Sequence, residues 1–551
     1  MMIDTILDNG RILTCDTDYP QAQRIGLHRG RIMGVDGQLD GLTAQKTVNL
    51  DGAVVVPGFN DVHAHSVWFG LSMTELDLSA ARTALDVYTK VASKAASLPE
   101  GEWIIGANLE LLNLASEPTL AGLDAAAPNH MLFLKSNSGH SGLVNSPVLA
   151  RIRQSAGYSL EVGSGIVRDR HGNETGLLEE NALRLVQALF MPYPLASIED
   201  ALERATAVYA SEGLTSVTDA GIAGGWIGNS PIEFAAYQNV LERGTLRTRM
   251  SPMITLDALN LDAGGTRTLQ TGIRTGLGDD RLRLGPVKIF TDGSLLGATA
   301  AMTEPYCGCD HGNNTGYLQA DALELTEAAL AAASAGWTLA LHAIGDAAVD
   351  LAVETIEKAR ERHGAPRSPH RIEHGGYVRP DQIARIAANG IVLVPQPHFI
   401  NAFGDGMREL LGEERTRYSY PVKSLLEAGA VLPGSSDRPV ADGRPLRVMQ
   451  SFVERTTASG AEYGPGERIT ATEALRAYTV GSAATTGTGD RLGQLRPNYL
   501  ADLTVLADDP TTIESSRIGS IEVVATALGG KATHDPHGLF ARSLHQSMYR
   551  N

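Results

Sequence analysis

The start of the chain alternates short apolar runs with turn sequences, a pattern that predicts strands rather than helices. Residues 6–14 place the pair Asn9-Gly10 between apolar residues, which predicts a β-hairpin, and residues 25–35 repeat the pattern. Residues 502–506 and 523–528, near the far end of the chain, are strand-like as well. Because strands from opposite ends of a chain can pair, we expect both ends to build one small β-sandwich.

Between the two ends the pattern changes to strands that alternate with helices. Helical stretches such as 321–335 and 347–363 separate most of the strand-like runs. These runs lie at 54–65, 214–219, 247–255, 282–290, 337–342, 370–374, 391–396 and 430–437. Eight alternating β/α units over several hundred residues predict an α/β fold of the TIM-type (β/α)8 barrel class.

One region does not fit eight even units. Residues 70–196 separate the first predicted strand from the second and far exceed an ordinary βα connection. We interpret them as an α/β insertion over the barrel mouth, where inserts cover the site and shape specificity. The sequence from Ser197 to Asp200 resembles a capping box and predicts the start of the next helix, which Gly213 ends.

These changes of pattern define the expected domains. The barrel occupies residues 58–489 and includes the insertion. The sandwich has an N-terminal part at 1–57 and a C-terminal part at 490–535. A polar tail follows at 536–551, and it is either a free end or an oligomer contact, so a homodimer is one alternative.

Composition and charge narrow the class of protein. Of the 551 residues, 43% are hydrophobic and 20% are charged, as in ordinary globular proteins. The net charge of −17 argues against a nucleic-acid partner. No apolar run is long enough to span a membrane, and the first residues lack the pattern of a signal peptide. We therefore expect a cytoplasmic protein with a small-molecule substrate and no membrane partner.

The chain has three cysteines, too few for a disulfide framework, which fits a reducing compartment. Cys307 and Cys309 flank one glycine and are either a thiolate pair or incidental loop thiols. The second interpretation is favoured, because no cluster with zinc-finger spacing accompanies them.

Candidate chemistry lies at the ends of the predicted barrel strands. His63 and His65 are separated by one residue on the first strand, so their side chains project from the same face and can chelate a metal such as zinc. Four further strands carry a polar residue at or near their ends: Lys288, His342, His374 and Asp437. Taken alone, each of these residues can also be explained without a functional role, as a surface, structural or turn residue.

Together the six residues converge on one rim, because barrel enzymes carry their chemistry at the C-terminal ends of strands. A ring of four imidazoles, a carboxylate and a buried amine suits two divalent cations, with zinc the expected metal.

The ordered motifs resemble the amidohydrolase superfamily, and within it the branch of N-substituted formamide deformylase. The resemblance covers nearly the whole chain and is not specific for a substrate. The matching stretches are 9–12, 57–65, 172–179, 287–288, 291–294, 342–346, 371–374, 436–437, 493–495 and 500–506.

The resemblance implies a role for each ligand. His63 and His65 would hold the first metal together with Asp437, and His342 and His374 would hold the second. Lys288 would be carboxylated by carbon dioxide so that its carbamate bridges both ions. A hydroxide shared by the metals would attack the carbonyl group, and Asp437 would act as the general base and then the general acid.

The inserted region departs from this resemblance. Relatives commonly carry an Arg, an Asp and a Trp around a His-Ser pair, and here Ser136, Ser138 and Leu143 stand at those places. His140 of that pair either contacts the substrate or is structural. The loss of a possible Arg contact weakens any transfer of substrate preference from relatives.

The expected activity is hydrolysis of a C–N bond other than a peptide bond, in a neutral amide or N-substituted formamide. Trp68, Phe69, Trp103 and Leu143 would suit a hydrophobic N-substituent at the mouth, or they are ordinary core residues of the insertion. Two alternatives stay open. The first is a cyclic amidohydrolase or deaminase of the same superfamily, and the second is a catalytically idle binding protein on this fold.

Overall fold

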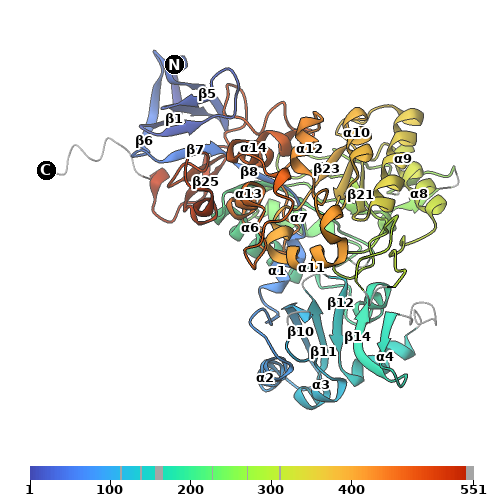
Figure 1. The fold of residues 1–551 in the computed structure, drawn as a ribbon. Helices are drawn as coiled ribbons and strands as arrows, with labels where there is room; N and C mark the ends of the chain where they lie inside the picture. The colour runs from blue at the N-terminus through green and yellow to red at the C-terminus, as the bar shows by residue number, and fades with distance from the viewer. Residues whose placement is uncertain are drawn as a thin grey trace. The chain divides into compact units, whose positions relative to one another are not determined.

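The computed structural model describes residues 1–111, 114–136, 139–155, 165–225, 227–262, 264–269, 271–308 and 312–541. The chain divides into two compact units (Figure 1). Unit 1 consists of Met1–His65, Glu203–Gly221 and Tyr237–Asn551, and unit 2 consists of Ser66–Leu202 and Ile222–Ala236.

Unit 2 is larger than the insertion expected at 70–196, because the segment 222–236 joins it through polar contacts. The N–H of Tyr193 donates to the carbonyl of Asn229 at 3.0 Å. The carboxylate of Glu233 accepts the backbone N–H groups of Ala223 and Asn229 at 2.9 and 2.8 Å. The first of these bonds ties the segment 222–236, which follows the predicted strand 214–219, to the far end of the insertion, and the other two bonds lie within the segment itself.

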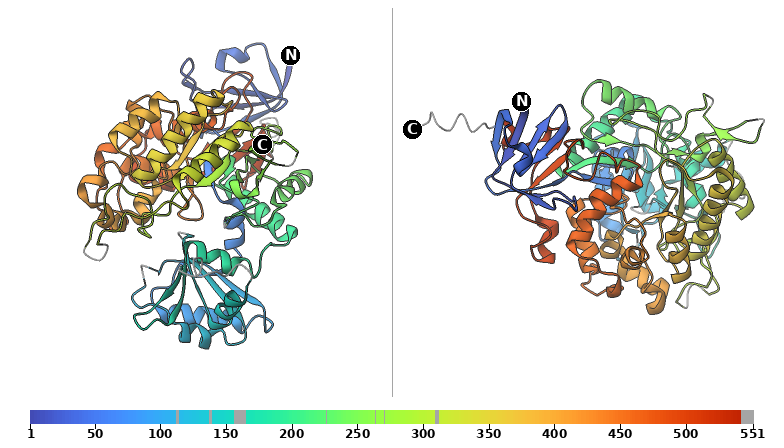
Figure 2. Two further views of the ribbon diagram at one scale, coloured as in Figure 1. Left: turned by 90° about the vertical axis from the view of Figure 1, so that its right-hand side faces the viewer. Right: turned by 90° about the horizontal axis from the view of Figure 1, so that it is seen from above.

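Strands from both ends of the chain form two facing sheets in unit 1. One sheet has the order β5-β4-β1-β6, and the other has the order β26-β25-β24-β7-β2-β3. The central pairing of the second sheet is antiparallel between β7 and β24, with Val55 opposite Val505. Figure 2 shows the N-terminal strands in blue beside C-terminal strands in red. The strands are β1 (Met2–Asp8), β2 (Arg11–Leu13), β3 (Gln21–Ala22), β4 (Ile25–His28), β5 (Arg31–Val35), β6 (Thr43–Asn49), β7 (Val54–Pro57), β24 (Leu503–Leu506), β25 (Val523–Leu528) and β26 (Lys531–His534).

The two sheets share one apolar core. Leu7 and Leu27 of the first sheet belong to the same buried cluster as Val55, Val505 and Ala527 of the second. Since each strand alternates its side chains between two faces, the apolar face of each sheet is buried against the other.

The hairpin predicted at residues 6–14 is wrong, because the chain crosses between the two sheets there. β1 pairs with β4 and β6, whereas β2 pairs with β3 and β7. Gly10 lies in tight contact, since a Cβ atom at that position would stand 2.4 Å from Leu50 Cδ1. The second predicted hairpin is confirmed, with β4 and β5 antiparallel around Arg29 and Gly30 at φ 50° and 76°.

The central part of unit 1 contains two sheets of parallel strands. One has the order β16-β15-β8 and the other β17-β20-β21-β22-β23. The strands are β8 (Phe59–Ala64), β15 (Leu214–Asp219), β16 (Arg249–Met250), β17 (Ile254–Thr255), β20 (Val287–Phe290), β21 (Leu339–Ala343), β22 (Arg371–His374) and β23 (Val392–Val394). Helices alternate with the later strands: α8 (Ala322–Ser334), α9 (Asp346–His363) and α10 (Pro380–Ala388). This mixture of parallel strands and helices is an α/β fold.

Several predicted elements differ from the structure at their ends. The strand expected at 54–65 is broken at Gly58, where a Cβ atom would stand 2.2 Å from Thr215 Oγ1. The run 247–255 divides between the two parallel sheets, and the run 282–290 becomes a strand only from Val287. Helix α6 (Leu195–Ser211) begins before Ser197, which therefore lies in its first turn instead of capping it.

The predicted strand at 430–437 is not a regular strand. Its backbone still follows β8, because Val62 N–H donates to the carbonyl of Gly434 at 3.1 Å and Asp437 N–H donates to that of His63 at 2.7 Å. Gly434 directs its own N–H to the carbonyl of Ala477 instead of a second strand. Asp437 itself has a φ of 58°, which a strand does not accommodate.

Unit 2 is an α/β body built on one six-stranded sheet with the order β13-β14-β12-β11-β10-β9. Leu132 and Leu134 of β11 belong to one buried cluster and Phe133 to another, so both faces of the sheet are covered. The elements are β9 (Leu76–Asp77), α2 (Ala84–Ala95), β10 (Trp103–Leu109), α3 (Leu120–Ala126), β11 (Met131–Ser136), β12 (Ser141–Val144), α4 (Ser146–Gln154), β13 (Ile166–Arg168), β14 (Glu174–Glu179) and α5 (Leu183–Gln187).

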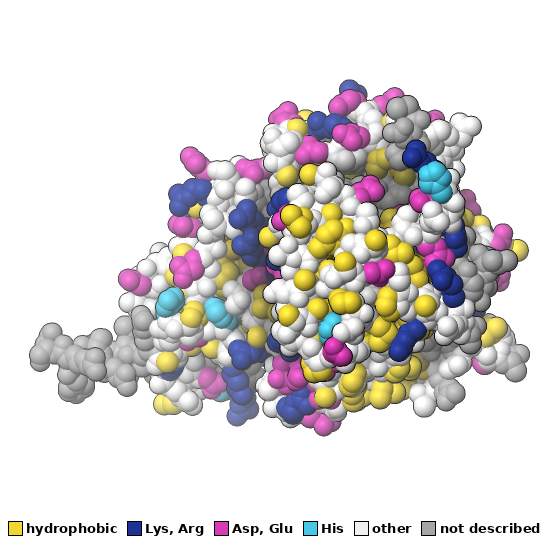
Figure 3. All heavy atoms as spheres, turned by 90° about the horizontal axis from the view of Figure 1, so that it is seen from below, with side chains coloured by type: hydrophobic (Ala, Val, Ile, Leu, Met, Phe, Trp, Pro, Cys, Tyr) yellow, Lys and Arg dark blue, Asp and Glu magenta, His cyan; other side chains and the backbone are white. Residues whose placement is uncertain are grey.

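The surface carries charges of both signs. On the face shown in Figure 3, basic and acidic side chains are interspersed with hydrophobic ones. Within the part of the chain that the structure describes, none of the helices combines the length and apolarity needed to cross a bilayer.

Removing residues 491–551 is expected to give insoluble protein. The truncation deletes β24, β25 and β26, so β7 loses a central neighbour and the apolar face of the remaining sheet is exposed. The soluble fraction after expression measures the effect. Lys531→Ala, on the exposed part of β26, is the matched control and should stay soluble. Soluble, active protein from the truncated chain would show that the C-terminal strands are dispensable.

Candidate metal centre

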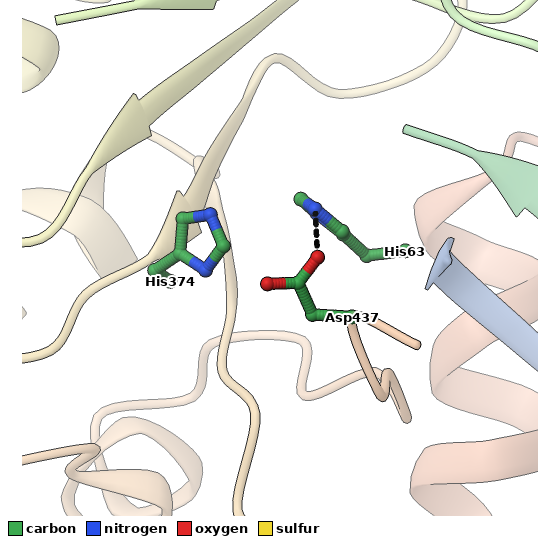
Figure 4. A group of neighbouring side chains, drawn as sticks. All are labelled: His63, His374 and Asp437. Atoms are coloured by element: carbon green, nitrogen blue, oxygen red, sulfur yellow. Dashed lines mark ion pairs between the residues drawn. The ribbon is translucent and has the colours of Figure 1, made fainter. Parts of the chain in front are cut away.

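Three predicted ligands form one buried cluster in unit 1. His63 lies on β8, and His374 is the last residue of β22. Asp437 is the last residue of the segment 434–437, whose backbone runs beside β8. One donor atom from each side chain lies within 4.8 Å of the other two. Figure 4 shows the two imidazoles and the carboxylate directed toward a common centre. This arrangement is the core of a candidate metal site.

His65 joins this cluster through Asp437. Its Nε2 lies 3.0 Å from Asp437 Oδ1, and the Nε2 of His63 lies 3.3 Å from the same oxygen. The spacing of the two histidines predicts that both lie on one strand. This is confirmed for His63, whereas His65 comes directly after the end of β8. Backbone bonds hold the two segments together, since His65 N–H donates to the carbonyl of Arg438 at 2.7 Å.

His342 and Lys288 come from the strands next to β22. His342 lies on β21, and its ring centroid is 4.5 Å from that of His374. Lys288 lies on β20 opposite Ala340, two residues before His342 on the neighbouring strand. Because side chains repeat every second residue along a strand, Lys288 and His342 project from the same face of the sheet. Both lie outside the three-residue cluster but on the same sheet as His374.

Hydrogen bonds orient three of the imidazoles. Nδ1 of His63 donates to the Glu373 carboxylate at 2.5 Å, because an ionised carboxylate only accepts. Nδ1 of His374 donates to Gln396 Oε1 at 2.8 Å, and Nε2 of His342 donates to the carbonyl of Gly293 at 3.0 Å. A bond of this kind fixes the tautomer and directs the other ring nitrogen elsewhere, as in proteins whose histidines bind metals.

Glu373 is held in turn by a buried arginine. Arg371 Nε lies 2.5 Å from Glu373 Oε1, and Arg371 Nη2 donates to the carbonyl of Val62 at 2.6 Å. Burial acts to raise the pKa of Glu373, but the charges of Arg371 and His63 hold that pKa below its usual value. Glu373 is therefore an anion that links β22 to β8, the strand that carries His63.

Burial sets the protonation of the cluster. It lowers the pKa of His374 to about 3 and also lowers the pKa of His65, so both imidazoles are neutral near pH 7. Burial acts to raise the pKa of Asp437, but His63 and His65 hold that pKa well below its usual value. Neutral imidazoles and a carboxylate are the forms that bind metals.

Lys288 is almost completely buried, with 1% of its surface exposed. Burial lowers the pKa of its amine to about 8, although Glu373 and Asp437 partly oppose this. Its Nζ lies 4.9 Å from the centroid of the Phe290 ring. A substantial neutral fraction near neutral pH makes this amine more nucleophilic than an exposed lysine.

The donor set fits a divalent metal such as zinc. Imidazole nitrogens and a carboxylate are its ordinary ligands, and the whole group is buried. Within the described residues, Nε2 of His63 is buried and makes no hydrogen bond, although it faces the Asp437 carboxylate. A buried polar atom without a hydrogen bond is rare, and a ligand atom for a cation explains this one.

The other predicted contacts belong to unit 2. Nδ1 of His140 donates to the carboxylate of Glu180 at 3.0 Å. Trp68 is on α1 (Ser66–Ser72) and lines a pocket within the unit. Leu143 is a core residue with 3% of its surface exposed, and Trp103 packs against Phe190 with ring centroids 5.2 Å apart. The expectation that Leu143 lines a mouth is therefore replaced by its alternative, a core position.

The cysteine interpretation stays a prediction. Cys307 is an exposed free thiol, its Sγ lies 3.1 Å from Arg415 Nη2, and Cys309 lies outside the described residues.

Sequence reasoning did not identify the residues that orient the ligands. The sequence does hint at Arg371 and Glu373. They carry opposite charges, are separated by a single residue, and lie in a strand that was expected to be buried. It offers no such hint of Gln396, because a single glutamine after a strand is common. Asp61 was missed as well: it is buried, burial raises its pKa to about 6, and it accepts the N–H groups of His63 and Ser436.

Comparison with known proteins identifies the family. The sequence profile of the amidohydrolase family (Amidohydro_3) matches residues 46–534. The chain is 32% identical to Protein LONG AFTER FAR-RED 3 of Arabidopsis thaliana over 96% of this chain and 91% of that protein. It is 29% identical to N-substituted formamide deformylase of Arthrobacter pascens over 98% of this chain and 99% of that protein.

A solved structure supports the same assignment. An uncharacterised metal-dependent hydrolase from Pyrococcus horikoshii superposes with a TM-score of 0.74 at 25% sequence identity, over 93% of this chain and 99% of that one. The resemblance stated from the motifs is confirmed, and the protein belongs to the amidohydrolase family.

Proposed function

We propose that this protein is a metal-dependent hydrolase that cleaves the C–N bond of a neutral amide or N-substituted formamide. The observation that carries the proposal is the buried cluster of His63, His374 and Asp437, whose donor atoms lie within 4.8 Å of one another. Membership of the amidohydrolase family and full-length similarity to a formamide deformylase support the type of bond.

Two divalent metal ions would be held by the six predicted ligands. His63, His65 and Asp437 would bind the first ion, and His342 and His374 the second. Bound divalent ions supply a Lewis acid and lower the pKa of water toward neutrality.

Lys288 would supply the bridging ligand as a carbamate. Its neutral Nζ forms a bond to the carbon of carbon dioxide and releases one proton, which leaves a carboxylate on the side chain. Burial in an apolar strand and the pKa of about 8 support this step, because only the neutral amine reacts.

Asp437 would move the proton during hydrolysis. One carboxylate oxygen accepts a proton from the attacking water and then delivers it to the nitrogen of the leaving amine. The carboxylate is ionised at neutral pH, as a base must be, and its backbone bond to His63 fixes it beside the imidazoles.

We also propose that the parallel strands of unit 1 together form one (β/α)8 barrel, with the sandwich at 1–57 and 490–535. The isolated bridge between Met250 and Leu282 and the bond from Met253 N–H to Asp219 O support a connection between the two parallel sheets. The bonds from Val62 and Asp437 support closure through the segment 434–437.

Protein purified without chelator is expected to hold about two metal ions per chain and to release amine from N-benzylformamide. Elemental analysis gives the metal content, and a panel of N-benzylformamide, N-acyl amino acids and cyclic ureides gives the preference. Full activity in metal-free protein would reject metal dependence. Ring opening of a ureide, or preference for an anionic N-acyl amino acid, would reject the substrate class and leave the family assignment intact.

Gln396→Leu is expected to weaken metal binding by about 10–100-fold, because it removes the acceptor that orients His374. Competition with a calibrated chelator measures the affinity. Gln396→Glu is the matched control, since it keeps an acceptor of the same length and should retain affinity at least equal to that of the wild type. Equal affinity in the Leu variant would show that the orientation of His374 does not depend on this bond.

A further inference from the structure

We propose that a groove in unit 1 binds an organic molecule that carries a diphosphate group. The groove has a volume of about 550 Å³, which is within the usual range for small-molecule sites. All of its lining residues belong to unit 1. They come from separate segments of the chain, namely helix α6, the residues 244–247 that precede β16, Arg281, and the hairpin of β25 and β26.

The lining of the groove is mostly basic. Within the described residues, Glu203 is the one acidic side chain in the lining, against four basic ones: Arg204, Arg247, Arg281 and Lys531. Glu203 is itself neutralised, because Arg243 Nη2 lies 2.8 Å from its Oε1 and the hydroxyl of Thr245 donates to the same oxygen at 2.8 Å. In a chain whose net charge is −17, this local excess of positive charge favours an anionic ligand.

Three of the basic side chains have no counter-ion in the protein. Among the described residues, Arg247, Arg281 and Lys531 form no ion pair with a carboxylate. Arg247 Nη1 donates to the carbonyl of Thr533 at 3.1 Å. Arg281 Nη2 donates to the carbonyl of Leu246 at 2.7 Å. A carbonyl holds a guanidinium in place without cancelling its charge, so the charge of both arginines remains for a ligand.

Arg281 has the strongest need for an anion, because its side chain is half-buried. Burial lowers the pKa of its guanidinium, and the charge of Arg249 acts in the same direction. The charges of Asp502 and Asp279 oppose this effect. Since an arginine stays protonated in proteins, a partly desolvated guanidinium without a counter-ion costs free energy. An anionic group in the groove would offset this cost.

The kinds of side chain in the lining indicate the class of ligand. A guanidinium binds phosphate oxygens through two parallel hydrogen bonds, and an ammonium adds a compact positive charge. Three uncompensated cations suit a group that concentrates several negative charges, as a diphosphate does. Apolar side chains in the same lining suit an organic part of the ligand: Ala207, Leu246, Leu528 and Ala532. This site lies beyond the proposed hydrolytic function and uses none of the metal ligands.

The test uses the full-length protein and four probes: ADP, AMP, inorganic pyrophosphate and citrate. Titration calorimetry gives the dissociation constant of each. ADP is expected to bind about tenfold more tightly than the others, because AMP carries less charge, pyrophosphate lacks the organic part and citrate lacks phosphate. Added salt should weaken the binding of ADP, since it screens the charges. Binding of AMP, pyrophosphate or citrate as tight as that of ADP would overturn the proposal.

Two double variants test the location of the site. Arg247→Gln with Lys531→Gln changes two exposed side chains, so the protein should fold, and ADP should bind about tenfold more weakly. Lys423→Gln with Arg517→Gln is the matched control, because it removes the same charge from exposed positions outside the groove. The control should change the affinity for ADP by less than about twofold. Equal weakening in both double variants would overturn the proposal.

Asp437→Asn separates the groove from the candidate metal centre, because phosphates also bind metal ions. Its affinity for ADP should equal that of the wild type. Loss of ADP binding in this variant, with full binding in Arg247→Gln/Lys531→Gln, would place ADP at the metal centre and overturn the proposal. Hydrolysis of N-benzylformamide by protein that does not bind ADP would reject the groove as a site and leave the proposed function standing.

Discussion

Asp437→Asn should lower kcat by about 10²–10⁴-fold without unfolding the protein. The amide keeps the size of the side chain but cannot take a proton from water at neutral pH. The loss should be near the upper end of the range, because the same carboxylate lies 3.0 and 3.3 Å from the Nε2 atoms of His65 and His63. Measured rates of amine release and the metal content of the variant separate lost proton transfer from lost metal.

The matched control for this variant is Asp442→Asn. Asp442 pairs with Arg444 outside the candidate site, so the replacement removes a carboxylate without touching a ligand. It should hydrolyse substrate at close to the wild-type rate. A wild-type rate in Asp437→Asn itself would contradict the proposed role of that residue.

Lys288→Ala should lose bound metal and activity together. Without the amine no carbamate forms, so both proposed metal positions lose a shared ligand. The change also leaves space at a fully buried position, and a small carboxylate such as acetate, added in excess, should restore part of the metal content and activity. Metal per chain and kcat/KM, each measured with and without acetate, test the bridging role.

Two further replacements distinguish the carbamate from a simple positive charge. Lys288→Arg keeps a cation that cannot form the carbamate, and it should not support activity. Lys288→Met keeps the length and apolar contacts, so it controls for packing and should fold while staying inactive. Full activity in the arginine variant would show that the charge of Lys288, not its carbamate, is what matters.

The candidate ligands were predictable because they depend on local rules. His63 was placed by its predicted strand and His374 by the end of another, although His65 lies directly after β8 and the two-residue period of a strand accounts for its position only in part. Their orienting partners were not, because Glu373 meets His63 across 310 positions in the sequence. Contacts over such separations depend on which strands become neighbours, and no short stretch of sequence specifies that.

The fold was predictable where the local sequence of an element is enough to determine its secondary structure. The strand 214–219 has the bounds expected from its apolar run. The Asn9-Gly10 hairpin failed because packing against Leu50 and pairing with two different sheets overrode a local turn preference. The segment 430–437 failed because its backbone bonds to β8 and to Ala477 replace a regular ladder.

The pairing of β7 with β24 has a consequence for the order of events during synthesis. The sheet β5-β4-β1-β6 uses only residues near the start of the chain, so it has its complete set of strands early. β7 must wait until residue 503 has been made, roughly 450 residues later. At about 5–20 residues per second, this delay lasts roughly 20–90 s. Throughout that interval the apolar Val54–Val56 edge is available to chaperones and to other nascent chains on the same messenger RNA.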